Sequence, residues 1–130
     1  MANSGVVVVH YGLIKLVSNE DEFAFVLLHE LGHLKLKPFP PAIINDDGSE
    51  EIDFALYFEH ERAADKFAQQ KLIAAGCDGC AGYTIARKTL LAGPIDLSNP
   101  FDVVFIKRVE LLAVDCKQSM PQIPGKPSPR

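Results

Sequence analysis

Two histidines and a glutamate lie together in the segment His29-Glu30-Leu31-Gly32-His33. A separation of four residues is about one turn of an α-helix, so both imidazoles would stand on one face. Two imidazoles spaced in this way can bind one zinc ion, at about 2.0–2.1 Å each. Glu30 would lie beside the metal, where its carboxylate can take a proton from a metal-bound water. The pattern therefore predicts a metal site with hydrolytic chemistry.

The alternative is that both histidines merely pack inside a buried helix. Two imidazoles and a carboxylate in so apolar a segment would cost free energy without polar partners. We therefore favour metal binding, and we expect one zinc ion per chain.

A catalytic zinc site needs a third protein ligand and an open position. The segment 52–75, which we expect to be helical, carries Glu61 and Asp65 four residues apart. We expect Glu61 to be the third ligand and Asp65 to accept the free ring N–H of a ligating histidine. Glu59 and His60 are alternative third ligands, and a solvated helix face is the alternative interpretation of the two acids.

Four helices are expected to position these groups. Asn19 and Glu22 have the spacing of a capping box, and the helix after them is apolar on almost every side, which is typical of a central, buried helix. Gly76 can end the second helix. Ser98 or Asn99 can cap the fourth, which has a proline at its first position. The expected ranges are 21–37, 52–75, 81–91 and 100–116.

The remaining segments suggest a small amount of sheet. Residues 6–10 are rich in valine and favour a short strand, whereas residues 12–17 fit either a strand or a short helix. Residues 38–51 are expected to form a loop with a turn at 45–48. The predicted fold class is therefore α+β and mostly helical, with a small N-terminal sheet or edge strand.

Composition limits the classes of protein that this chain can belong to. Its 130 residues suffice for one domain, which we expect at 1–118, followed by a proline-rich flexible tail at 119–130. The net charge of −4 argues against a nucleic-acid partner. No apolar stretch is long enough for a membrane span, and the N-terminus lacks the features of a signal peptide.

The three cysteines do not suggest a disulfide-rich secreted protein, so we expect a reducing, cytoplasmic location. Cys77 and Cys80 form a C-x-x-C motif, typical of a redox pair or half a zinc site, although a plain turn is the favoured interpretation. Cys116 is expected to be a buried free thiol.

The sequence resembles the gluzincin metallopeptidases, and within them the family of HtpX-type heat-shock proteases and CAAX prenyl endopeptidases. The resemblance covers about residues 3–112, and the two most specific motifs are H-E-x-G-H and E-x-x-A-D. The matching segments, in order, are Val6–Val9, Gly12-Leu13-Ile14, Glu20-Asp21-Glu22, His29–His33 and Glu61–Asp65, with approximate matches at Ala75–Asp78, Asn99-Pro100 and Arg108.

This resemblance implies a zincin-like fold with an active-site helix and a glutamate-bearing helix, and it implies a zinc endopeptidase. The substrate would be a peptide or an unfolded protein segment. It would lie in extended form along an edge strand formed by Val6, Val7, Val8 and Val9. The family members are membrane-embedded, so this chain resembles a soluble, minimal catalytic domain.

One departure concerns the group that stabilises the tetrahedral intermediate. Relatives have a histidine where this chain has Asn99, and an amide donates a hydrogen bond without carrying a charge. Arg108 and His10 are further candidates, as are His60 and Tyr83.

Two other functions fit the same residues. A zinc-binding regulatory or interaction module of this fold would keep the metal with little proteolytic turnover. A purely structural helical domain would bind no metal.

Overall fold

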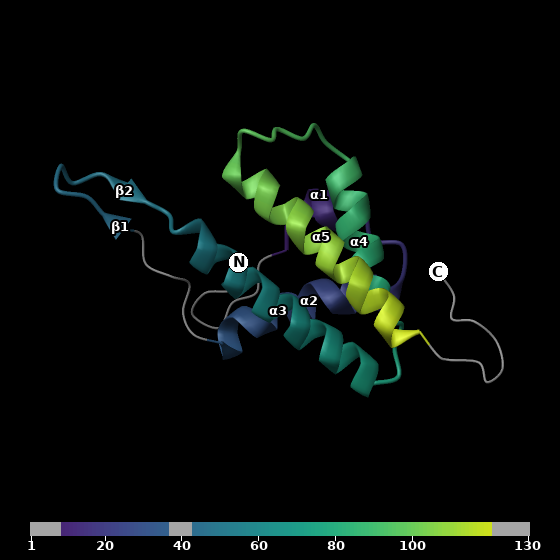
Figure 1. Cartoon of the computed structure of the whole chain (residues 1–130). Helices are drawn as coiled ribbons and strands as arrows, with labels where there is room; N and C mark the ends of the chain where they lie inside the picture. Colours follow the sequence, from purple (N-terminus) through teal and green to yellow (C-terminus); the bar gives the residue numbers. More distant parts are fainter. Residues whose placement is uncertain (1–8, 37–42, 121–130) are drawn as a thin grey trace.

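Helices dominate the computed structural model, which describes residues 9–36 and 43–120. The described residues form five helices and one antiparallel pair of very short strands (Figure 1). This arrangement confirms the expected class, α+β and mostly helical. The elements are α1 (Tyr11–Ile14), α2 (Glu20–Lys35), β1 (Ile43–Ile44), β2 (Glu50–Glu51), α3 (Phe54–Ala74), α4 (Ala81–Leu91) and α5 (Pro100–Ser119).

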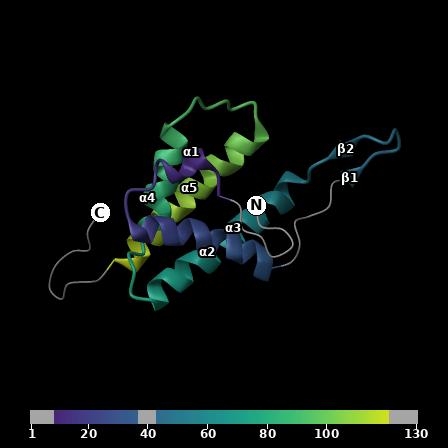
Figure 2. The same cartoon turned by 180° about the vertical axis from the view of Figure 1, so that it is seen from behind.

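The sheet lies elsewhere than the sequence suggested. Ile43 pairs with Glu51 across a turn in which Gly48 has φ +84°, and this hairpin projects from the helices (Figure 2). Val9 is not part of a strand, because the chain turns into α1 directly after it, with the carbonyl of His10 accepting from the N–H groups of the first turn. The rest of the expected edge strand, residues 6–8, lies outside the described residues.

Helix α2 is buried on one face only, so the expected all-round burial is wrong. Phe25 and Val26 are buried, whereas Phe23 and Leu31 are each 40% exposed. Neighbouring helices cover one side of α2, so the apolar residues on its other side remain at the surface. Asn19 caps the helix as expected by accepting a hydrogen bond from the backbone N–H of the third residue after it.

The other helices follow the sequence closely. Gly76, at φ +77°, follows the end of α3, and α4 has the expected bounds. Asn99 caps α5 through a hydrogen bond accepted from the N–H of Phe101 at 3.0 Å. Helix α5 continues to Ser119, three residues beyond its expected end, so the expected tail begins inside a helix. Residues 121–130 lie outside the described part of the chain.

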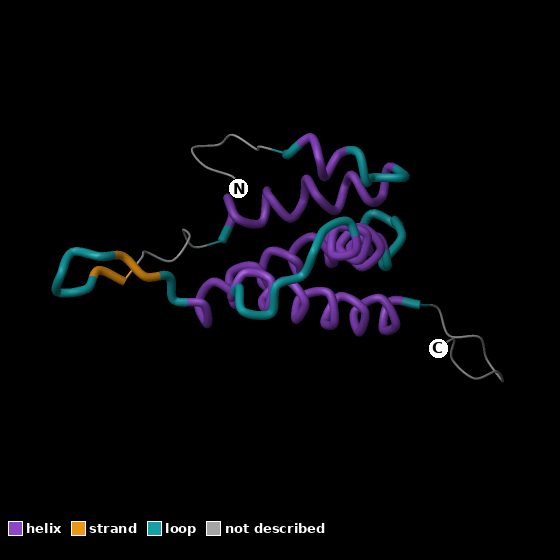
Figure 3. The backbone as a smooth tube through the Cα atoms, turned by 90° about the horizontal axis from the view of Figure 1, so that it is seen from above, coloured by secondary structure: helices purple, strands orange, loops and turns teal. Residues whose placement is uncertain are grey.

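The core lies where α2, α3, α4 and α5 meet, with the hairpin at one end of this helical body (Figure 3). Gly82 on α4 lies directly against the ring of Phe25 on α2, so a larger residue there would overlap the ring. The buried apolar cluster consists of Phe25, Val26, Ala68, Leu72, Ala81, Ile85, Ala86, Val109 and Leu112. Within residues 9–36 and 43–120, no helix combines the length and hydropathy that crossing a bilayer requires.

A disulfide joins Cys80 and Cys116, so the expectation of a free thiol at Cys116 is wrong. The start of α4 lies beside the end of α5, with 4.4 Å between the two Cα atoms. Sequence spacing does not reveal this proximity. The C-x-x-C cysteines do not pair with each other, and Cys77 is a free thiol. Since disulfides are typical of oxidising compartments, the cysteine content does not support the expected cytoplasmic location.

A buried carboxylate fastens the start of α2 to α4. Glu22 accepts hydrogen bonds from Lys88 Nζ and Thr84 Oγ1, both at 2.6 Å, and from the backbone N–H of Ser18 at 2.7 Å. Burial raises the pKa of Glu22, but these hydrogen bonds together outweigh it and hold the pKa below its usual value of 4.5. The resulting stabilisation is present above about pH 4.5 and is lost as the pH falls through the folded-state pKa.

We therefore expect Glu22→Gln to lower the free energy of unfolding at pH 7 by about 1–3 kcal/mol, because a buried charge-assisted network is broken. Below pH 4.5 the variant should lose stability less steeply than the parent. Denaturant unfolding between pH 3 and pH 7 measures both effects. Glu110→Gln, at an exposed position of α5, is the matched control. A parallel pH dependence in Glu22→Gln and the parent would contradict the prediction.

Candidate metal centre

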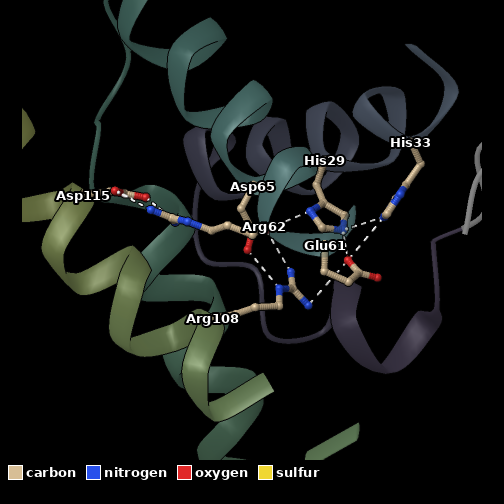
Figure 4. A network of polar contacts seen from close by, with 7 residues as sticks. All are labelled: His29, His33, Glu61, Arg62, Asp65, Arg108 and Asp115. Carbon is tan, nitrogen blue, oxygen red and sulfur yellow. Dashed lines mark hydrogen bonds and ion pairs between the residues drawn. The ribbon is translucent and has the colours of Figure 1, made fainter. Parts of the chain in front are cut away.

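Helices α2 and α3 approach closely at the glycine inside the H-E-x-x-H segment. A Cβ atom built on Gly32 would lie 3.2 Å from the Cα of Ala64 and 3.2 Å from a ring carbon of Phe67. Two small residues therefore allow the backbones to come together. This contact brings the histidines of α2 to the face of α3 that carries Glu61 (Figure 4).

Three ligand atoms converge between these helices. The Nε2 atoms of His29 and His33 are 3.2 Å apart, and they lie 3.0 and 3.3 Å from Oε2 of Glu61. Atoms that bind zinc tetrahedrally at about 2.0–2.1 Å lie about 3.3–3.4 Å from one another. Two imidazole nitrogens and one carboxylate oxygen at this separation therefore fit a zinc ion in both spacing and chemistry.

The structure brings Glu61 to the histidines and does not bring the alternative third ligands there. Among the described residues, the group that could hold a metal ion consists of His29, His33 and Glu61. Glu59 is exposed, and neither it nor His60 belongs to this group. Positions 59 and 60 are turned around the axis of α3 relative to position 61, so they do not share its direction.

A second layer of polar groups lies behind His29. Asp65 Oδ1 accepts a hydrogen bond from His29 Nδ1 at 2.8 Å, and the Asp65 side chain is completely buried. Arg108, from α5, donates to both carboxylate oxygens of Asp65, at 2.8 and 2.9 Å. A hydrogen bond at Nδ1 fixes the ring orientation and leaves Nε2 facing the cluster.

The charged groups of the cluster shift one another's pKa values. Burial lowers the pKa of His29, but hydrogen bonds to Asp65 and Glu61 outweigh it and raise the pKa to about 9. Burial has the opposite effect on the two carboxylates, whose pKa values are nevertheless held low by His29 and by the guanidinium of Arg108. Because a zinc ligand must be neutral imidazole, metal binding near neutral pH would release the His29 proton.

A cavity of about 370 Å³ opens beside His29 and Glu61. It lies between α1, α2, α3, α4 and α5, and its lining combines apolar side chains with a similar number of polar ones. This volume is large enough for an apolar side chain together with water molecules. The lining residues are His10, Leu13, Phe25, Val26, His29, Glu30, Tyr57, Glu61, Ile85, Ala86, Thr89, Phe105 and Arg108.

Only some of the residues proposed to stabilise a tetrahedral intermediate border this cavity. His10 and Arg108 border it, whereas Asn99 does not, because its side chain caps the exposed start of α5. Sequence reasoning missed Tyr57, which also borders the cavity and lies one helical turn before Glu61. Its spacing from Glu61 was a usable signal, since residues four apart share a helix face.

Two other residues expected to act in the site, Tyr83 and Val9, do not line the cavity. Tyr83 packs against the hydrophobic core. Val9, the described member of the expected edge strand, also packs against the core and forms no strand.

The chain was compared with protein families, curated proteins and solved structures. A sequence profile of peptidase family M48 matches residues 1–57, a segment that contains α1, His29 and His33 but ends before Glu61. This match supports a zinc metallopeptidase family. No curated protein matches the chain, and no solved structure does.

The close contact at Gly32 generates a prediction for the metal site. Gly32→Val should push α2 away from α3, because its side chain would meet the backbone of Ala64, and overpacking of this kind costs about 1–3 kcal/mol. Affinity for zinc should fall at least tenfold, as measured by competition with a chromophoric chelator. Gly93→Val is the control, since open space surrounds Gly93. Equal zinc affinity in both variants would refute the importance of this contact.

Proposed function

We propose that this chain, whose first 57 residues match peptidase family M48, is a zinc-dependent endopeptidase. Its substrates would be peptides or extended, unfolded protein segments. The observation that carries the proposal is the convergence of three ligand atoms, 3.0–3.3 Å apart, beside a cavity that Glu30 borders. His29, His33 and Glu61 would be the zinc ligands.

Each side chain has a chemical task in this proposal. When bound, zinc acts as a Lewis acid that polarises a carbonyl group and makes water more acidic. The Glu30 carboxylate takes the proton of the attacking water as the new C–O bond forms and the carbonyl carbon becomes tetrahedral. It then delivers this proton to the amine nitrogen, which leaves as the peptide C–N bond breaks. Asp65 holds His29 in the tautomer that keeps its proton on Nδ1.

The cavity supplies the remaining parts of a peptidase site. Its apolar lining can hold a substrate side chain close to Glu30. His10 and Tyr57 border it and can donate hydrogen bonds to the carbonyl oxygen of the scissile bond. For Tyr57, burial and the nearby Glu61 carboxylate raise the pKa, so its hydroxyl keeps its proton at neutral pH.

Casein cleavage by zinc-loaded protein tests the proposal. The parent should degrade casein, and a chelator should abolish the activity. Glu30→Gln keeps the shape of the side chain but removes the base, so we expect at least a 100-fold loss of activity, the lower range for such a group. Fragment formation is followed by gel electrophoresis and mass spectrometry.

The control is the zinc content of the variant, which should equal that of the parent because Glu30 is not a ligand. Zinc binding without cleavage by either protein would refute the peptidase and favour the regulatory zinc module. Absence of zinc from the parent would refute the metal site as well.

A further inference from the structure

Arg108, on α5, contacts two acidic side chains of α3, those of Asp65 and Glu61. Its Nε and Nη2 atoms donate to the two oxygens of Asp65, at 2.9 and 2.8 Å. Its Nη1 lies 3.7 Å from Oε2 of Glu61. One guanidinium therefore faces the proposed ligand and the residue that orients another ligand (Figure 4).

The two parallel hydrogen bonds from Arg108, here called the fork, fix the orientation of the Asp65 carboxylate. Asp65 Oδ1 accepts from both His29 Nδ1 and Arg108 Nη2, while Oδ2 accepts from Arg108 Nε. A single hydrogen bond to His29 would leave the carboxylate free to rotate, whereas two parallel donors fix its plane. Burial adds to this constraint, since the Asp65 side chain has no exposed surface and that of Arg108 is 13% exposed.

Arg108 also has a fixed place of its own. Its guanidinium carbon lies 5.3 Å from the ring centre of Phe105, one turn earlier in α5. The side chain therefore lies between an aromatic ring and a buried carboxylate. This arrangement suits a group that positions others, because residues of this chain hold it on both sides.

On the basis of the proposed function, we infer that Arg108 is a positioning residue, which acts through Asp65 to set the His29 ring for zinc. This role differs from stabilising the transition state, for which Arg108 is also a candidate because it borders the cavity. The two roles predict different measurements. A positioning residue changes the affinity for zinc, whereas a group that contacts only the transition state changes kcat at full zinc occupancy.

Arg108→Lys is the discriminating variant, because lysine keeps the positive charge but cannot form the fork. We expect its zinc affinity to fall about 10- to 100-fold, the usual effect of losing a group that orients a metal ligand. At saturating zinc, kcat for casein should stay within about fivefold of the parent. Unchanged zinc affinity with a kcat loss of about 100-fold or more would instead show transition-state stabilisation and overturn the inference.

Arg62→Lys is a matched control. Arg62 of α3 forms the same kind of fork with Asp115 of α5, at 2.7 and 3.0 Å, at a similar depth but away from the cluster (Figure 4). Although Arg62 follows Glu61 in the sequence, its guanidinium is directed to Asp115 and away from the cluster, so zinc affinity should stay within about twofold of the parent. An equal loss in both variants would mean that any weakening of the α3–α5 contact affects zinc, which overturns the inference.

A double-mutant cycle tests whether Arg108 acts through Asp65. Adding Arg108→Lys to Asp65→Asn should change zinc affinity by less than about twofold, because residues that act as one unit are not additive. A further tenfold loss would overturn the inference. If Arg108→Lys alone does not fold, a second double variant replaces it. Asp65→Asn/Arg108→Gln removes both charges together, and its zinc affinity is compared with that of Asp65→Asn. A difference of less than about twofold supports the inference, and a tenfold loss overturns it.

These titrations need no substrate, so they decide the role of Arg108 even if the parent does not cleave casein. A parent that binds no zinc overturns this inference together with the proposed function.

Discussion

The close approach of α2 and α3 at Gly32 and Ala64 is the constraint on which the site depends. A tetrahedral metal needs its ligands within a few ångströms of one another, and here the three candidate ligand atoms come from two different helices. Helix axes packed through larger side chains lie about 8–10 Å apart. With no side chain on one helix and a methyl group on the other, the imidazoles of α2 reach the carboxylate of α3 directly.

The buried charges extend this contact to a third helix. His29, Asp65 and Arg108 form a continuous series from α2 through α3 to α5, and each member has a partner of opposite charge or a hydrogen-bond acceptor. Buried charges are costly unless they are paired in this way. The series therefore links the His29 imidazole to α5, a helix that contributes no residue to the candidate ligand group.

Covalent and polar links hold the walls of the cavity. The disulfide between Cys80 and Cys116 joins the start of α4 to the end of α5, and Glu22 joins the start of α2 to Lys88 on α4. Both links lie outside the cluster of His29, His33 and Glu61. They keep α4 beside α2 and α5, so the apolar residues of α4 can line the space next to Glu30.

Local signals in the sequence predicted α2 to α5 and the candidate ligand pair on α2. Asn19, Asn99 and Gly76 mark helix ends through short-range hydrogen bonds and backbone conformation, which depend on neighbouring residues alone. The spacing of His29 and His33 likewise follows from one helical turn. Only the tertiary structure decided which acid of α3 meets these histidines, that Arg108 lies behind Asp65, that Tyr57 borders the cavity, and that Cys116 pairs with Cys80. Each of these depends on which faces of distant helices pack together, and helix periodicity within one segment carries no information about the partner face.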